Sequence, residues 1–285
     1  HYQPHPAFAL DASGRPEYLF ETAAAGERYH QIPDFPHTGD RPVHANDYVY
    51  AIKRLADPVI GSPMLGFMSQ YIVGMKAFSE QVASLPRDQW LDLDNYAMEG
   101  LEVVDERTLT ITIIGRYPQF LFWLAMPFFS PVGPEVDRFY HNPGFVDRNL
   151  TLDWWPVGSG PFLMASNDPN SEIILERNPN YRDDFFPSEG EPGDLEAGFL
   201  ADAGKPIPFV DRAVFRIEKE SLSQWTKFLQ GYYDRSGEVH SQPAGLFDRA
   251  FQIGANGVEL APELKEHNIT MSPDVQPAVY YYGFN

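Results

Sequence analysis

The residues that could carry out chemistry are few, and the first candidate is the glycine-rich segment Gly158–Pro161. Closely spaced glycines can cradle a phosphate, but the segment lacks the Gly-Lys-Ser/Thr ending of a phosphate-binding loop, and Pro161 stands where a helix should begin. Ser159 lies in Gly-x-Ser-Gly, one residue short of the Gly-x-Ser-x-Gly turn that exposes a nucleophilic serine. We therefore interpret the segment as a tight turn between strands.

The sequence also gives little indication of a metal-binding site. Acidic residues gather in the Gly- and Pro-rich stretch 183–206, but they do not alternate around a glycine as in an EF-hand loop. Among the histidines of the first 44 residues only His1 and His5 are four positions apart, and they lie in a Pro- and Gly-rich stretch that predicts loops rather than the helix such a metal site needs. The absence of cysteine excludes thiolate ligands, cysteine nucleophiles and disulfides. We expect no catalytic residue, no metal and no cofactor.

Composition narrows the classes of partner. The formal net charge of −19 repels phosphate backbones and anionic lipid, so we expect no nucleic-acid partner. Hydrophobic residues make up 43% of the 285 residues, which predicts a packed protein with one or two domains. No apolar run approaches the roughly 20 residues of a membrane helix. We expect a monomer.

Helical periodicity is clearest just after residue 44. Apolar residues recur at helical spacing from Tyr48 to Ala56, with Asp47 in the first turn and Asp57-Pro58 as the stop signal. A second apolar stretch from Met64 to Ala77 is also predicted to be helical. Between 221 and 232, a Ser221/Gln224 capping-box pattern precedes a third helix whose face carries Leu222, Trp225, Leu229 and Tyr232.

Strand patterns occur between these helices. Apolar residues alternate with threonines in 101–113, which predicts a hairpin turning at 105–107. Further strands are predicted at 172–177, 213–218, 269–271 and 279–284. The aromatic segment 117–129 is predicted to be buried, and 183–206 to be a long surface loop. Helices and strands without strict βαβ alternation predict an α/β protein with mixed sheets in two lobes.

Four of these segments, in order, resemble motifs of the family 5 extracellular solute-binding proteins, the peptide-binding components of ABC importers. Arg41–Pro58 resembles the family's Pro-Val helix, and Gly158–Phe162 resembles its Gly-Thr-Gly-Pro-Tyr turn. Ile174–Tyr181 resembles its Arg-Asn-Pro-x-Tyr strand end, and Tyr280–Asn285 resembles the strand by which the chain leaves the first lobe. The chain departs from the pattern at His44, where the family usually has a threonine N-cap.

The resemblance implies a fold and a division of the chain. The family fold is of the periplasmic-binding-protein type II kind, with two lobes around a cleft. By resemblance, residues 1–133 match the extra domain of the first lobe, with a loop-rich insertion near 4–38, and residues 134–285 match part of its core domain up to the hinge strand. The second lobe is expected to follow Asn285, so we interpret the chain as a fragment.

The resemblance also implies a role, which is capture of a peptide by lobe closure and its delivery to ABC permease subunits, with no bond made or broken. The family is periplasmic, which implies a signal peptide that this chain does not contain. A non-peptide solute, such as a metal chelate or an oligosaccharide, stays open. From other classes, a carboxylate-dependent hydrolase stays open because the separation of two carboxylates is a three-dimensional quantity, and so does a structural interaction module.

The ligand-binding residues that the resemblance implies are few. Tyr281 matches a cleft tyrosine near the hinge, and Met64, which follows Gly61-Ser62-Pro63, matches a position where relatives place an aromatic on the ligand. Ser62 belongs to the same turn. Ser236 and Gly237 match a cleft-lining loop. Tyr281 and Met64 could instead fill core space, and the pair Trp154-Trp155 is better explained by packing than by ligand stacking.

Overall fold

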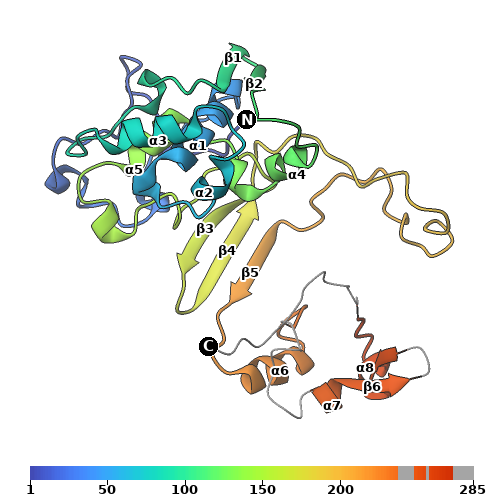
Figure 1. The fold of residues 1–285 in the computed structure, drawn as a ribbon. Helices are drawn as coiled ribbons and strands as arrows, with labels where there is room; N and C mark the ends of the chain where they lie inside the picture. Colours follow the sequence, from blue (N-terminus) through green and yellow to red (C-terminus); the bar gives the residue numbers. More distant parts are fainter. Residues whose placement is uncertain (237–246, 255–256, 272–285) are drawn as a thin grey trace, which may run out of the picture. The chain divides into compact units, whose positions relative to one another are not determined.

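The computed structural model describes residues 1–236, 247–254 and 257–271, and the chain divides into two compact units, residues 1–215 and 216–285. Short helices and small antiparallel sheets make up both units, which confirms the prediction of an α/β protein with mixed elements (Figure 1). The first unit holds α1 Ala45–Ala56, α2 Leu65–Met68, α3 Met75–Ala83, α4 Phe120–Leu124, α5 Pro134–Tyr140, β1 Leu101–Asp105, β2 Thr108–Ile111, β3 Phe162–Asp168, β4 Glu172–Arg177 and most of β5 Arg212–Arg216.

Helix α1 spans the predicted residues 45–56. The Asp47 carboxylate accepts the His44 backbone N–H at 2.8 Å, which satisfies a free donor at the helix start. Lys53 and Arg54 stand in the last turn, where cations favour the helix dipole. The backbone becomes extended at Asp57, because the residue before a proline disfavours the helical conformation, and α1 ends there.

The predicted helix over 64–77 is two helices. A turn separates α2 from α3, and Gly74 stands in this turn with φ of 75°. A Cβ atom at Gly74 would lie 2.9 Å from the Glu99 backbone nitrogen, so a side chain cannot be accommodated there. The Val73 N–H donates to Thr112 O at 3.0 Å, so the turn is anchored to the residue that follows β2. Backbone pairing with a distant segment therefore overrides the local helical pattern.

The predicted hairpin over 101–113 is confirmed as antiparallel β1 and β2. Strands β4 and β5 fall where strands were predicted, and the sheet order is β3-β4-β5. Strand β3 was not predicted. The turn at Gly158–Pro161 leads into β3, and the Asn178 side chain at the end of β4 donates to Gly160 O at 2.8 Å. The two motifs are therefore held together by a side-chain hydrogen bond.

The prediction that the aromatic segment 117–129 is buried is only partly correct. Phe120 and Phe129 are buried, whereas Leu121 and Phe122 on α4 are 72% and 76% exposed. A five-residue helix turns only some of its side chains toward one core, so a continuous apolar run does not imply continuous burial. The stretch 183–206 forms turns without helix or strand, as predicted for a surface loop.

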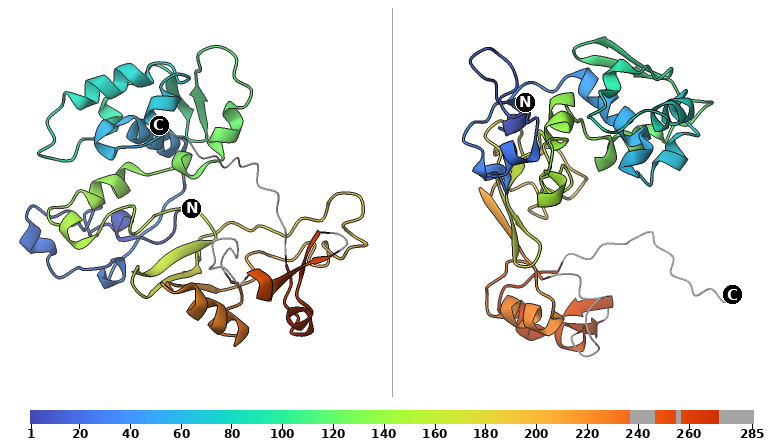
Figure 2. Two further views of the ribbon diagram at one scale, coloured as in Figure 1. Left: turned by 60° about the horizontal axis from the view of Figure 1, so that its bottom comes forward. Right: turned by 90° about the vertical axis from the view of Figure 1, so that its left-hand side faces the viewer.

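The first unit contains two hydrophobic cores. The first core joins residues of the first 43 positions, including Tyr2, Tyr29 and Phe35, to Val136, Phe139 and other residues up to Val157. The second core lies within residues 50–129 and includes Tyr50, Phe78 and Phe129. Both views in Figure 2 show the dark-blue start of the chain beside the yellow-green segment that carries α5, with the cyan segment of α2 and α3 as a separate group.

The chain enters and leaves the second core at one place. The Val132 N–H donates to Asp47 O at 3.2 Å. Arg41 donates to Asp47 and to Glu135 at 2.7–2.8 Å, so one guanidinium joins the segments before and after the second core. The predicted domain division at 133/134 stays a prediction. The predicted insertion near 4–38 contributes buried aromatic side chains to the first core.

The second unit holds α6 Ser221–Leu229, α7 Phe247–Ala250, β6 Phe251–Gly254, β7 Gly257–Leu260 and α8 Pro262–Glu266. Helix α6 begins after Glu220 with no side-chain cap, so the predicted Ser221/Gln224 capping box is wrong. On its predicted face only Trp225 is buried. Residues 269–271 form no strand, and the predicted strand 279–284 lies outside the described residues. The described helices include none long and apolar enough to cross a membrane.

The buried His5 ring has a hydrogen-bond partner at each of its two nitrogens. The Ala7 N–H donates to His5 Nδ1 at 3.1 Å, so Nε2 carries the proton and faces the Tyr140 hydroxyl at 3.1 Å. The Tyr140 hydroxyl donates to Trp155 O. Burial lowers the pKa of His5 from its usual 6.5 to about 3. A proton on Nδ1 would break the hydrogen bond with Ala7.

We therefore predict that acidification from about pH 6.5 to about pH 4 lowers the free energy of unfolding by about 3 kcal/mol, because only the unfolded chain then binds the proton. Urea denaturation at each pH measures the slope. His5→Gln should flatten the slope over this range, whereas His30→Gln, at an exposed position, should leave it unchanged. Equal slopes in all three proteins would contradict the assignment.

Candidate functional site

Of the predicted ligand-binding residues, the structure brings together Ser62 and Met64. Ser62 Oγ accepts the Met64 N–H at 3.3 Å, which shapes the turn that opens α2. The Met64 side chain is half-buried and packs against the second core. Ser236 is half-buried in the second unit. Gly237 and Tyr281 lie outside the described residues, so all five assignments stay predictions.

Phe67, Tyr71, Tyr117 and Trp123 form an aromatic cluster. Phe67, Tyr117 and Trp123 are half-buried and pack against the second core, as Met64 does, and Tyr71 contacts Phe67 and Tyr117. Phe67 lies with its ring centroid 5.0 Å from Trp123, and Tyr71 stacks on Tyr117 at 4.4 Å. The Trp123 indole N–H donates to the Tyr117 hydroxyl at 2.9 Å. Such rings offer apolar area with few polar atoms, which suits contact with an organic ligand.

The aromatic cluster was missed as a candidate site. The sequence signal for this cluster is the density of aromatic residues in 117–129, which by itself predicts only burial. The pair Trp154-Trp155 behaves as expected from packing. Trp155 is 6% exposed and belongs to the first core, and Trp154 packs against it.

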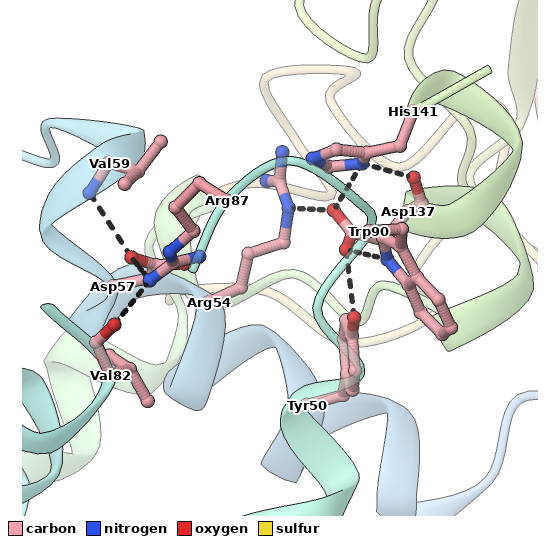
Figure 3. Close-up of polar contacts among 9 residues, drawn as sticks. All are labelled: Tyr50, Arg54, Asp57, Val59, Val82, Arg87, Trp90, Asp137 and His141. Atoms are coloured by element: carbon pink, nitrogen blue, oxygen red, sulfur yellow. Dashed lines mark hydrogen bonds and ion pairs between the residues drawn. The ribbon is translucent and has the colours of Figure 1, made fainter. Parts of the chain in front are cut away.

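A buried carboxylate network joins the two cores of the first unit (Figure 3). Asp137 on α5 accepts hydrogen bonds from Tyr50 Oη at 2.8 Å, Arg54 Nε at 2.7 Å and Trp90 Nε1 at 2.8 Å. His141 Nδ1, one helical turn later, lies 2.7 Å from the Asp137 backbone oxygen. All three side-chain donors come from residues between 50 and 90, so Asp137 fastens α5 to α1 and to the segment after α3.

A second buried carboxylate fixes the end of α1. Arg87 binds both oxygens of Asp57 at 2.8 Å and also donates to Val82 O at 2.9 Å (Figure 3). The Val59 N–H donates to Asp57 Oδ1 at 3.1 Å. Bidentate pairing satisfies the charge of this 4% exposed residue. The pair ties the C-terminal end of α1 to the segment that follows α3.

The chemistry of these carboxylates is structural. Burial alone raises the pKa of Asp137, but the charges of Arg54 and His141 and the hydrogen bonds from Trp90 and Arg54 outweigh it and lower the pKa below its usual value. An acid held ionised in this way is a poor proton donor at neutral pH.

Asp47 and Glu135 form a further pair of carboxylates, and Arg41 binds both. This pair therefore lacks the free acid and free base of a glycosidase. Among the described residues, no group of three or more His, Asp or Glu side chains could hold a metal ion.

Comparison with known proteins identifies the family. Residues 37–285 match the family described as bacterial extracellular solute-binding proteins, family 5 Middle. The chain therefore belongs to the family 5 solute-binding proteins, which confirms the resemblance of the four motifs.

The curated relatives include peptide-binding proteins. The periplasmic oligopeptide-binding protein OppA of Salmonella typhimurium is 30% identical over 142 residues, which cover 50% of this chain and 23% of OppA. The dipeptide-binding protein DppE of Bacillus subtilis is 28% identical over 148 residues, covering 51% and 24%. The probable deoxycholate-binding periplasmic protein YgiS of Escherichia coli is 26% identical over 170 residues, covering 58% and 28%. The matched regions span about a quarter of the length of these relatives.

Solved structures of the same kind are similar to the chain. OppA of Burkholderia pseudomallei has a TM-score of 0.49 at 19% identity. The match covers 73% of this chain and 33% of the OppA chain. OppA of Haemophilus influenzae in complex with the peptide RPPGFSPFR has a TM-score of 0.45 at 20% identity, with coverages of 68% and 30%.

The Asp137 network yields a stability prediction. Asp137→Ala leaves Arg54 without its carboxylate partner between the two cores, so we expect a loss of about 3–5 kcal/mol in the free energy of unfolding by urea denaturation. Asp147→Ala removes an exposed carboxylate from the same region and should change stability by less than about 0.5 kcal/mol. Similar stabilities of the two variants would show that Asp137 does not join the cores.

Proposed function

We propose that the chain is part of the substrate-binding component of an ABC importer, located in the periplasm, that captures peptides in a cleft between two lobes. The observation that carries the proposal is the family match over residues 37–285. The names of OppA and DppE, which describe peptide-binding proteins, support a peptide as the solute. Transfer of the peptide to the permease and lobe closure belong to the same proposal.

In this proposal the first lobe supplies one wall of the cleft. Ser62 and Met64 would contact the peptide from the turn before α2, and the aromatic cluster beside them would hold apolar peptide side chains. Ser236, Gly237 and Tyr281 would line the cleft from the later part of the chain. Main-chain hydrogen bonds would hold an extended peptide with little regard to its sequence. No bond is made or broken, which agrees with the structural roles of the paired carboxylates.

A non-peptide solute is the second candidate. It is favoured by the relative named as a probable deoxycholate-binding protein. The half-buried aromatic side chains that pack against the same core as Met64 suit an amphipathic organic solute as well as an apolar peptide side chain.

Mass spectrometry of small molecules released from the protein purified from its host separates the two candidates. We expect peptides of mixed sequence, because main-chain recognition tolerates side-chain variation. A single non-peptide compound in stoichiometric amount would overturn the peptide proposal and support the second candidate.

A variant tests the predicted cleft residue. Met64→Ala in the same protein should weaken peptide binding about three- to tenfold in calorimetry, because part of an apolar contact is lost. Met126→Ala, at a 44% exposed methionine of the same unit, is the matched control and should bind like the wild type. Unchanged affinity in Met64→Ala would remove Met64 from the site.

The chain of residues 1–285 by itself should bind peptides more weakly than micromolar, because the proposed cleft needs a second lobe. Isothermal titration with a mixture of tripeptides measures this. Micromolar affinity would show that one lobe suffices and that closure is not required for capture.

A further inference from the structure

The first unit contains a cavity of about 270 Å³ that the proposed peptide site does not use. It lies between the N-terminal segment, residues 90–92 and α5. Its apolar wall is formed by Pro6, Pro16, Tyr18, Leu19, Pro134 and Phe139. Neither Ser62 nor Met64 lines it. Pockets for drug-sized ligands measure about 300–1,000 Å³, so this cavity suits a smaller molecule.

A guanidinium group lines the cavity on a fixed aromatic platform. The Arg138 Cζ atom lies 5.4 Å from the centroid of the Trp90 ring. Trp90 cannot rotate freely, because its indole N–H donates to the buried Asp137 (Figure 3). Within the described part of the chain, the Arg138 side chain has no ion-pair or hydrogen-bond partner. Its five N–H donors are therefore available to an anion, at a defined place.

A carboxylate lines the same cavity. Asp92 is the N-cap of the short helix Leu93–Asn95, and its Oδ1 accepts the Asp94 N–H at 3.0 Å. It too forms no ion pair with any residue that the structure describes. Glu135, the third charged residue of the lining, differs because Arg41 binds both of its oxygens. The cavity thus presents one available cation and one available carboxylate, beside an apolar wall.

We propose that this cavity binds a free amino acid with an apolar side chain. The ligand carboxylate would pair with Arg138, its ammonium with Asp92, and its side chain would contact Tyr18, Phe139 and the prolines. A simple anion would meet the charges of Asp92 and Glu135, and a simple cation would meet Arg138. A zwitterion satisfies both charged groups, and burial of its side chain adds the apolar contribution.

The test titrates L-phenylalanine into the 1–285 chain and follows the Trp90 indole signal by ¹H–¹⁵N NMR, which distinguishes it from the other four of the five tryptophans. We expect saturable shifts of the Trp90 signal. Phenethylamine, which lacks the carboxylate, and 3-phenylpropanoate, which lacks the ammonium, should each bind at least about tenfold more weakly, in line with the loss of one charge-assisted contact.

Two variants assign the charges. Arg138→Gln keeps most of the aliphatic stem, and Asp92→Asn keeps a good N-cap, so both preserve the local structure while removing one charge. Each should weaken L-phenylalanine binding about tenfold, whereas Arg107→Gln, at an exposed turn outside the cavity, should not. Circular dichroism checks that all variants are folded.

Three results would overturn the proposal. They are equal binding of L-phenylalanine and its single-charge analogues, unchanged affinity in Arg138→Gln and Asp92→Asn, and no shift of Trp90 at about 10 mM ligand. Loss of binding in Met64→Ala alone would place the amino acid in the peptide cleft instead. Because the cavity shares no residue with the predicted cleft, its failure leaves the peptide proposal intact.

Discussion

The arrangement of the first unit depends on one buried carboxylate, that of Asp137. An ionised group with 4% exposure is tolerable only if its charge and its lone pairs are satisfied. Tyr50, Arg54 and Trp90 provide this from the segment that carries the second core, while Val136 and Phe139 on the same short helix as Asp137 pack into the first core. Apolar packing alone would let the two cores slide against each other, whereas three directional hydrogen bonds to one group allow few relative positions.

The same constraint shapes both proposals. Trp90 is fixed by Asp137, and Trp90 in turn supports the guanidinium of Arg138 in the cavity. The orientation of α1 follows from Arg54 and from the Asp57–Arg87 pair. The segment that carries Ser62 and Met64 directly follows α1, so the predicted cleft residues are placed by the ion pairs at its end.

The local parts of the fold could be predicted from the sequence. Helix α1 follows from its apolar spacing and its stop signal, and the hairpin of β1 and β2 from its alternation of apolar residues and threonines. The split at Gly74 could not be predicted, because it depends on backbone pairing of Val73 with Thr112. The exposure of Phe122 was missed for a similar reason, since hydrophobicity alone does not say which side of a short helix meets a core.

The candidate site shows the same limit more sharply. Motif resemblance indicated Ser62 and Met64, but the aromatic cluster joins residues some 50 positions apart, Tyr71 to Tyr117 and Phe67 to Trp123. The sequence likewise does not predict that the charged residues of the cavity lie together. Arg138 and Trp90 are separated by 48 positions and meet only because Asp137 brings their segments together. Sequence patterns report local periodicity, whereas these contacts depend on tertiary packing.

The contact between Asp47 and Val132 has a consequence for how the chain can evolve. A hydrogen bond between Asp47 and Val132 joins the two ends of the intervening segment, and this segment has its own hydrophobic core. Its removal or replacement would leave two chain ends already adjacent, so a short connection could rejoin them at little entropic cost. The region is therefore suited to replacement as a unit, provided that the substitute again supplies donors for Asp137.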